Sequence, residues 1–340
     1  FNMKDFLIKY NLFIIVLIVY LFFHFYTPFF STSFNLLTLA REGAELGIIC
    51  IAVTLVLILG RLDISVGSIM AVSAMIMILG FKSFEISWII LIFVCIFFGF
   101  IVGSVNGILS AVVGIPSFIA TLGTLIMLRG LLQWAAATKW MRDAQFMFSE
   151  DEGFLFIGNG DLFGIIPLSL FVMLIIFILV FLTLNFTKIG TSIYAIGGNF
   201  QSALRAGIRV KIIEIGVFAL VGICSAIAGI FLASRLDSVT YQTGQYLEFQ
   251  VLIAVILGGT SIAGGIGNIW GTILGIALIA ILNNGMVMMA VDRDIQDIII
   301  AIFLLFALFT DKYLHNIKSQ NSDKWKFADM YLLKNFFGKK

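Results

Sequence analysis

Long apolar runs constrain the fold of this chain more than any other feature. One extends from Ile165 to Phe186 and another from Ile212 to Ala233. At 1.5 Å per residue, each run is long enough as a helix to cross a hydrocarbon core of roughly 30 Å. A membrane-spanning barrel would instead show alternating segments of ~10 residues. The runs therefore predict an all-α polytopic membrane protein.

The composition agrees with this class and excludes an ordinary soluble domain. Hydrophobic residues make up 61% of the chain and charged residues 12%, whereas soluble domains have about 45–50% and about 25%. The net charge of +2 gives no indication of nucleic-acid binding, and we expect no nucleic-acid partner. Cys50, Cys95 and Cys224 stand inside apolar runs, and the two histidines lie far apart in sequence. We therefore expect no metal site.

The pattern predicts about ten membrane-spanning helices, of which some are short, broken or tilted. The first run is too long for a signal peptide, so we expect it to be a retained helix. An even number of spans places both termini on one side, and lysine and arginine favour that side by about fourteen to six, which predicts cytoplasmic termini. The expected spans are 11–30, 44–60, 64–80, 86–110, 116–134, 165–187, 212–234, 248–264, 268–291 and 295–310.

A polar loop at about 188–211 interrupts the apolar pattern near the middle of the chain. Its turn backbone cannot lie in lipid, and its basic residues predict a cytoplasmic position. Residues 202–206 are helix-compatible and Gly207 is placed like a helix-ending glycine, which indicates a folded docking surface. The residues expected to dock a partner are Tyr194, Gly197, Gly198, Asn199, Ala203, Arg205, Ala206 and Gly207.

Two glycine-rich segments stand at equivalent places in the two halves of the chain. One begins Ile58-Leu59-Gly60 and the other Ile256-Leu257-Gly258, and an isoleucine six residues on and a glycine nine residues on also coincide. Paired interruptions of this kind indicate transporter halves with discontinuous helices, although tight helix crossings also use glycine. The expected break residues are Gly60, Gly67, Gly258, Gly259, Gly264, Gly265 and Gly267.

Polar side chains within the spans are candidates for lining a solute pathway. Hydroxyl and amide groups suit a neutral, polyhydroxylated solute, although each could instead join two helices by a hydrogen bond. We expect Asp63 to shape a gate by capping a helix that begins at Ile64. The candidates are Asp63, Ser65, Ser68, Asn106, Thr121, Thr124, Asn283 and Asn284.

The chain carries no recognisable catalytic constellation and no phosphate-binding loop. An intramembrane enzyme is therefore disfavoured, and an energy source such as ATP would have to be bound by another chain. An ion-coupled secondary carrier remains the alternative, but it needs buried acidic residues on the path, and only Asp63 is a candidate.

Several motifs together resemble the ribose-type sugar permeases of bacterial ABC importers, which belong to the branched-chain permease superfamily. The resemblance extends from about Asn35 to Asp311, in the same order and spacing. The motifs are Leu62-Asp-Ile-Ser-Val-Gly-Ser68, Pro116-Ser-Phe-Ile-Ala-Thr-Leu122 with Leu128-Arg129-Gly130, Ile193-Tyr-Ala-Ile-Gly-Gly-Asn199 with Ala206-Gly207-Ile208, Leu257-Gly-Gly-Thr-Ser-Ile-Ala-Gly-Gly-Ile-Gly267, Gly271-Thr272 and Leu282-Asn283-Asn284-Gly285.

This resemblance implies a non-enzymatic permease subunit in a bacterial plasma membrane. Its implied partners are membrane lipid, a second identical or different permease chain, an extracytoplasmic solute-binding protein and cytoplasmic ATPase subunits that carry ATP and magnesium, with no cofactor on this chain. Residues 1–311 would form the permease domain, with the loop as coupling element, and 312–340 a basic cytoplasmic tail. The family commonly has Glu-Ala-Ala where Phe200-Gln201-Ser202 stand here, which favours an idiosyncratic ATPase contact. Relatives carry pentoses, hexoses, polyols or autoinducer-2.

Overall fold

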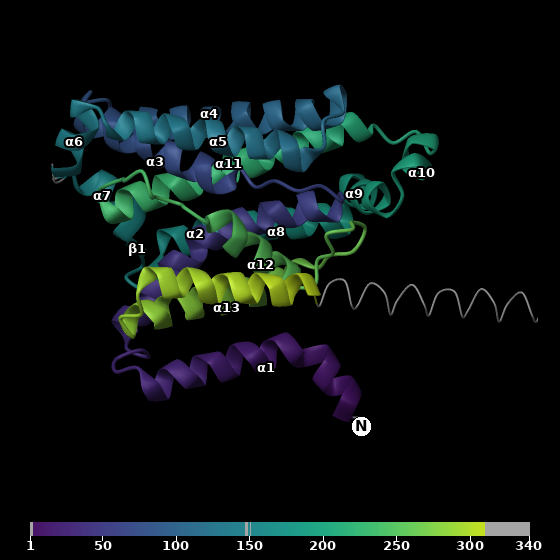
Figure 1. Cartoon of the computed structure of the whole chain (residues 1–340), viewed down its shortest axis with the longest axis horizontal. Coiled ribbons are helices and arrows are strands. Elements are labelled where there is room, and N and C mark those ends of the chain that lie inside the picture. Colours follow the sequence, from purple (N-terminus) through teal and green to yellow (C-terminus); the bar gives the residue numbers. More distant parts are fainter. Residues whose placement is uncertain (1–2, 147–148, 150, 310–340) are drawn as a thin grey trace, which may run out of the picture.

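A computed structural model describes residues 3–146, 149 and 151–309 (Figure 1). The predicted basic tail at 312–340 lies outside these residues. Each of the ten expected spans contains one helix. These helices are α1 (Met3–Tyr26), α2 (Ser33–Ile58), α3 (Val66–Lys82), α4 (Trp88–Ile108), α5 (Ser117–Ala136), α8 (Leu168–Phe186), α11 (Val210–Leu236), α12 (Leu247–Leu257), α13 (Ile269–Met288) and a helix at 293–309.

Five of these segments are long and apolar enough to cross a membrane. They are Trp88–Val113, Ser117–Ala136, Leu168–Phe186, Val210–Leu236 and Ile269–Met288. The first of them is α4 continued by a π-helical turn, η1 (Leu109–Val113), which ends at Gly114 in the left-handed region. The expected span 248–264 is wrong in its second half, because α12 stops at Leu257 and an irregular segment follows.

The long helix α11 is largely buried and packs against α2, α3 and α4. Its approach to α4 is close because glycines face each other there. A Cβ at Gly99 or Gly103 of α4 would overlap backbone of α11, and one at Gly222 of α11 would overlap the Gly99 carbonyl. Small residues of this kind let membrane helices pack backbone to backbone.

The helices divide into two groups, visible in Figure 1. One group holds α3, α4 and α5 around α11, and the other holds α2, α8, α12 and α13, with α1 packed on α13. The first break joins the two groups, because α3 follows α2, whereas the second lies within one group, because α13 follows α12.

Short elements close the two ends of the bundle. At one end lie α6 (Lys139–Phe146), α7 (Glu152–Asn159) and a hairpin of β1 (Asp161–Leu162) and β2 (Ile166–Pro167); we call this the α7 end. At the opposite end, the α9 end, lie α9 (Lys188–Gly198) and α10 (Phe200–Arg205). Figure 1 also shows the start of α1 and the C-terminal end of helix 293–309 at the α9 end.

The segment at 135–163 carries several acidic residues, and α7, in its described part, is folded onto the bundle. The Phe154 ring of α7 stacks on Phe81 at a centroid distance of 4.7 Å. The Gly158 amide donates to the Ser234 hydroxyl of α11 at 2.7 Å. Residues that bury an aromatic ring and share a buried hydrogen bond are part of the domain's structure, which accounts for the apolar residues between the acidic ones.

Candidate functional site

The two helix breaks share one local geometry. After α2, Gly60 adopts a φ of 71° and the Arg61 amide donates to the Val56 carbonyl at 3.0 Å. After α12, Gly259 adopts a φ of 90° and the Thr260 amide donates to Val255 at 3.2 Å. Both are helix ends of the Schellman type, in which a glycine takes the left-handed position. The expected pairing of Gly60 with Gly258 is therefore wrong by one residue.

The other expected break glycines take different roles. Gly67 lies in the first turn of α3 rather than in the break, and its missing side chain admits the Gly244 carbonyl. Gly258 is the C-cap residue of α12 and packs on Gly271 of α13. Gly264 and Gly265 do lie in the second break, with φ values of 87° and 73°. Gly267 lies there as well, without a positive φ.

The two breaks meet each other and α9 at a glycine junction, which we define as Gly60, Gly197, Gly198, Gly264 and Gly265. The Gly265 amide donates to the Ile58 carbonyl at 2.8 Å, so the second break bonds to the end of α2. A Cβ at Gly197 would overlap that same carbonyl oxygen, and one at Gly264 would lie 2.8 Å from the Gly60 Cα. Three chain segments thus touch through bare backbone.

Tyr194 extends this contact from α9 into the second break. Its hydroxyl donates to the Gly267 carbonyl at 2.9 Å. Burial raises the pKa of the Tyr194 phenol further above its ordinary value, at which the hydroxyl is already protonated at neutral pH. The α9 helix therefore contacts the second break through Tyr194 and the end of α2 through Gly197.

The polar loop forms two helices, of which the sequence analysis anticipated one. Thr187 caps α9 by accepting from the Gly190 amide, and Asn199 caps α10 by accepting from the Ser202 amide at 2.9 Å. The expectation that Gly207 ends a helix is confirmed: its φ is 78°, and the Ile208 amide donates to Ala203 at 3.2 Å. The α9 helix was missed because its glycines read as a loop; the Thr187 cap was the available signal.

The exposed side of α10 differs from the one expected. Ala203, one of the residues expected to dock a partner, is only 3% exposed and so offers no surface to a partner. The other five side chains of this helix are exposed, namely Phe200, Gln201, Ser202, Leu204 and Arg205, and so is Ala206, which follows it. Apolar side chains exposed on a short polar helix at the end of the bundle are suited to contact another protein.

Six of the eight candidate pathway residues form one buried hydrogen-bonded cluster. The Asp63 carboxylate accepts from the Ser65 amide at 2.8 Å and from its hydroxyl at 2.6 Å. The Asn106 amide donates to the Ser65 hydroxyl, and Thr124 donates to Asn106. The remaining bonds join Thr121 to the Ile64 amide and Ser68 to the Ser65 carbonyl.

This cluster fastens the first break to α4 and α5. It also corrects the expectation for Asp63, because α3 begins at Val66 with Ser65 at the cap position, so no helix starts at Ile64. Asp63 shapes the turn before the helix instead of capping it. Its pathway role, like that of the other cluster members, stays a prediction.

A second anchor of the first break was missed by the sequence analysis. Arg61 pairs with Glu214 of α11 at 2.8 Å, and the Ser110 hydroxyl donates to the same carboxylate at 2.6 Å. The Arg61 guanidinium also lies 5.6 Å from the centre of the Phe200 ring of α10. A glutamate inside an apolar run was the signal that a cationic partner had to be near.

The two adjacent asparagines of α13 point to different places. Asn284 exchanges amide hydrogen bonds with Asn35 of α2, at 2.8 and 3.1 Å, and is buried. Asn283 donates to Gln250 of α12 at 2.8 Å and borders a cavity near the α7 end. The structure therefore separates these two residues from each other and from the Asp63 cluster.

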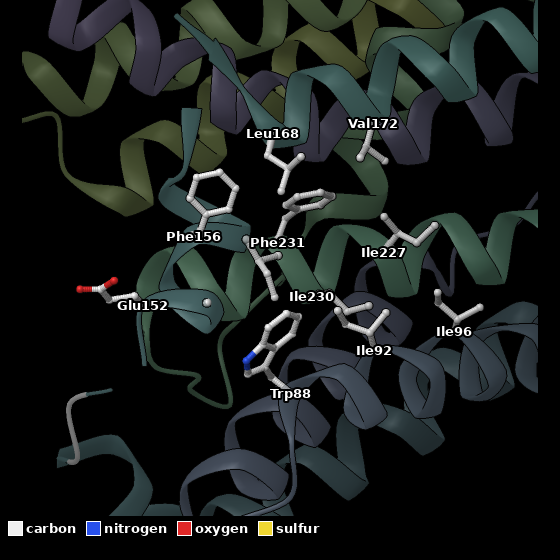
Figure 2. Close-up of a pocket in the computed structure, with 12 residues that line it drawn as sticks. Trp88, Ile92, Ile96, Glu152, Phe156, Leu168, Val172, Ile227, Ile230 and Phe231 are labelled. Atoms are coloured by element: carbon white, nitrogen blue, oxygen red, sulfur yellow. The ribbon is translucent and has the colours of Figure 1, made fainter. Parts of the chain in front are cut away.

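A different, largely apolar cavity of about 630 Å³ opens between α4, α8 and α11 beneath α7 (Figure 2). Trp88, Ile92 and Ile96 form one wall and Leu168 and Val172 the opposite one, while the Glu152 carboxylate points away from these side chains. Such a lining offers few partners for the hydroxyl groups of a polar solute. We therefore exclude this cavity from the candidate pathway.

The sequence comparisons define the class of protein. A family model described as branched-chain amino acid transport system / permease component matches residues 35–308. The chain therefore belongs to this family of permease components and is a multi-pass membrane transport protein. The fold of long apolar helices around paired breaks agrees with that class.

Individual relatives confirm the resemblance to ribose-type importer permeases. Ribose import permease protein RbsC of Haemophilus influenzae is 33% identical over 315 residues, which cover 92% of this chain and 96% of the relative. The probable ABC transporter permease protein YphD of Escherichia coli is 32% identical over 318 residues, covering 93% and 92%. Autoinducer 2 import system permease protein LsrC of Yersinia pseudotuberculosis is 33% identical over 304 residues, covering 87% and 82%. No solved structure matches the chain.

Proposed function

We propose that this chain is the permease subunit of an ATP-driven importer that moves a small neutral sugar or sugar-like solute into the cytoplasm. The observation that carries the proposal is the glycine junction, which joins both helix breaks to α9 through backbone contacts. Sequence similarity to ribose and autoinducer 2 import permeases supports the solute class.

The proposed partners follow from the two ends of the bundle. Cytoplasmic ATPase subunits, which carry ATP and magnesium, contact α9 and α10, where Phe200, Leu204 and Arg205 are exposed. A solute-binding protein delivers at the α7 end, and a second permease chain, identical or different, completes the membrane unit. This chain itself binds no cofactor.

The proposed orientation places the α9 end in the cytoplasm. Lys188, Arg205, Arg209 and Lys211 gather there, and basic residues accumulate on the cytoplasmic side of short loops. The start of α1 and the end of helix 293–309 lie at that end as well, which agrees with cytoplasmic termini. We propose that 1–311 form the permease domain and that 312–340 are a cytoplasmic tail.

Reconstitution tests the proposal. The chain is co-purified with its partner subunits into proteoliposomes, and ATP hydrolysis is measured with and without the solute-loaded binding protein. Gly207→Val should abolish ATPase association, because a branched side chain cannot adopt the left-handed backbone that ends α10. Arg205→Ala should be mild, because an exposed ion pair contributes only about 0.2–1 kcal/mol. Normal assembly and transport by Gly207→Val would contradict the docking assignment.

A further inference from the structure

The apolar cavity of about 630 Å³ beneath α7 lies between the two groups of helices (Figure 2). Its walls on α4 and α11 belong to one group, and its wall on α8 belongs to the other. Ile92 and Ile227 line it from the first group, and Leu168 and Val172 from the second. All three of these helices are long and apolar enough to cross a membrane. The cavity is therefore a space within the membrane-spanning part of the protein.

The faces of α4 and α8 beside the cavity are apolar and exposed. Ile89 and Phe93 of α4, each one position after a wall residue, are 51% and 67% exposed, and Phe171 of α8 is 44% exposed. On membrane-spanning helices, such side chains face the hydrocarbon of the bilayer. Water is a poor occupant of the cavity itself, because a bound water needs polar partners that this lining does not supply. Hydrocarbon is the medium that reaches the cavity.

The cavity is about as deep as one leaflet of a bilayer. Its wall on α4 extends from Trp88, the first residue of that helix, to Ile96. These eight steps along a helix correspond to about 12 Å, and half of a hydrocarbon core of ~30 Å is roughly 15 Å. Leu168 is likewise the first residue of α8, and Phe231 lies near the end of α11. A space that begins at three helix ends, beside a tryptophan, and reaches toward the midplane matches an acyl chain of the leaflet at the α7 end.

Helix α7 closes the outer end of this space. The Ser234 hydroxyl of α11 donates to the Phe154 carbonyl at 2.6 Å and accepts from the Gly158 amide at 2.7 Å. Gly153 lies against the Trp88 ring, since a Cβ at this glycine would be 2.9 Å from a ring atom. Because α7 packs on both α8 and α11, this roof is attached to both helix groups. A chain that enters from the side, between α4 and α8, is thus enclosed on several sides.

We propose that one acyl chain of a membrane phospholipid occupies this cavity as a bound constituent of the protein. The chain enters from the leaflet at the α7 end and fills the space between the two helix groups. It contacts both groups through dispersion, and each added contact stabilises the arrangement of helices that this structure shows. The proposal depends on the membrane helices and their lining, and it does not depend on which solute is transported.

Quenching of Trp88 fluorescence tests this site. The full chain, with its other four tryptophans changed to phenylalanine, is purified in detergent and freed of lipid. It is then titrated with dioleoyl phosphatidylglycerol that is brominated on its acyl chains, because bromine quenches a tryptophan only in close proximity. Trp88 lines the cavity. Its emission should fall by at least about twofold and saturate at about one lipid per chain, as expected for one enclosed site.

Val172→Phe is the variant that occupies the cavity from the α8 wall with a protein side chain. It should remove the saturating phase of quenching. Its matched control is Val94→Phe, which makes the same change at a 44% exposed position of α4 outside the cavity and should keep that phase. Ile227→Phe fills the cavity from α11 and serves as the second variant if Val172→Phe does not fold.

Thermal unfolding separates lipid binding from damage to the fold. Added lipid should raise the unfolding temperature of the wild type by at least about 3 °C and that of Val172→Phe by less than about 1 °C. Without lipid, Val172→Phe should unfold no earlier than the wild type, because its ring supplies the packing that the acyl chain otherwise provides.

Two results would overturn the site. Quenching that rises without saturation, equally in the wild type and in Val172→Phe, would show only lipid around the outside of the protein. In the complete importer with its partner subunits, the saturating phase should persist. Its loss on assembly would show that a partner chain, and not a lipid, covers the cavity.

Discussion

The two helix breaks begin with the same turn and are held in different ways. The first, between Ile58 and Val66, is tied by side chains to three membrane helices, through Arg61 with Glu214 and through the Asp63 cluster. In the described part of the chain, the second break bonds through backbone to the end of α2 and to Tyr194. The buried hydroxyl of Thr260 in this break has no hydrogen-bond partner there.

This difference indicates that the two breaks, although similar in their first turn, have different structural roles. A break tied to α4, α5 and α11 is a fixed reference within the bundle. A break tied to α9 follows whatever displaces α9. Gly197 is the point at which α9 touches both, because it packs on Ile58 and lies next to Gly265. The following changes test this contrast, beginning with the largest expected effect.

Gly197→Ala should destroy the junction. The new methyl group would overlap the Ile58 carbonyl oxygen, which is backbone and cannot move aside cheaply, so we expect a loss of more than about 3 kcal/mol of stability. The matched control is Gly198→Ala, where a Cβ meets nothing within 4 Å and the effect should be within about 1 kcal/mol. Thermal unfolding in detergent measures both. Equal unfolding temperatures for the two variants would remove the junction from the account.

Glu214→Ala should loosen the first break without touching the second. It leaves Arg61 without its carboxylate and Ser110 without its acceptor, so we expect a loss of about 2–3 kcal/mol. Glu152→Ala, at an exposed carboxylate of α7, serves as control and should stay within about 0.5 kcal/mol. Chemical denaturation of the purified protein compares them. If Glu214→Ala were as stable as the control, the ion pair would not anchor the break.

Two substitutions of Asp63 distinguish whether transport depends on the turn geometry of the first break or on the negative charge of this residue. Asn at this position keeps an oxygen that can accept from the Ser65 amide and hydroxyl, whereas Ala removes both bonds. Asp63→Asn should therefore retain most transport, and Asp63→Ala should lose several times more. Uptake into proteoliposomes is the measurement. Equal losses would argue for a role that depends on the negative charge.

Tyr194→Phe should weaken the link between α9 and the second break. It removes one hydrogen bond to the Gly267 carbonyl, worth about 1 kcal/mol, and leaves the ring in place. ATP hydrolysis should continue while solute moved per ATP falls severalfold, because the break no longer follows α9 fully. Ser192→Ala, two residues away on the same helix, provides a control for general damage to α9. An unchanged ratio in Tyr194→Phe would contradict the link.

Periodicity and charge were sufficient to predict the membrane helices and the place of the polar loop. The glycine at position 207 was sufficient to predict the end of α10, because a left-handed residue is needed there. The register of the two breaks was not predictable from letter identity. Gly258 matches Gly60 in the aligned sequence, but Gly259 takes the positive φ, and only backbone geometry distinguishes two adjacent glycines.

The interaction partners of the polar residues could not be predicted from the sequence either. Asn283 and Asn284 are neighbours in the chain, but successive side chains of a helix point about 100° apart and reach different partners. The pairing of Arg61 with Glu214 could not be predicted either, because the two residues are distant in sequence. Long-range partners of this kind depend on how the helices pack, and helix packing does not appear in a single sequence.

The contrast between the breaks is tested most directly by the reactivity of one cysteine in each. In a background without Cys50, Cys95 and Cys224, Leu62→Cys and Ala263→Cys are labelled with a maleimide in the reconstituted importer, before and after trapping with ATP and vanadate. We expect the rate at Ala263→Cys to change by more than about fivefold and that at Leu62→Cys by less than about twofold, because only the second break is free to follow α9. Equal changes at both positions, or a change confined to Leu62→Cys, would contradict the account.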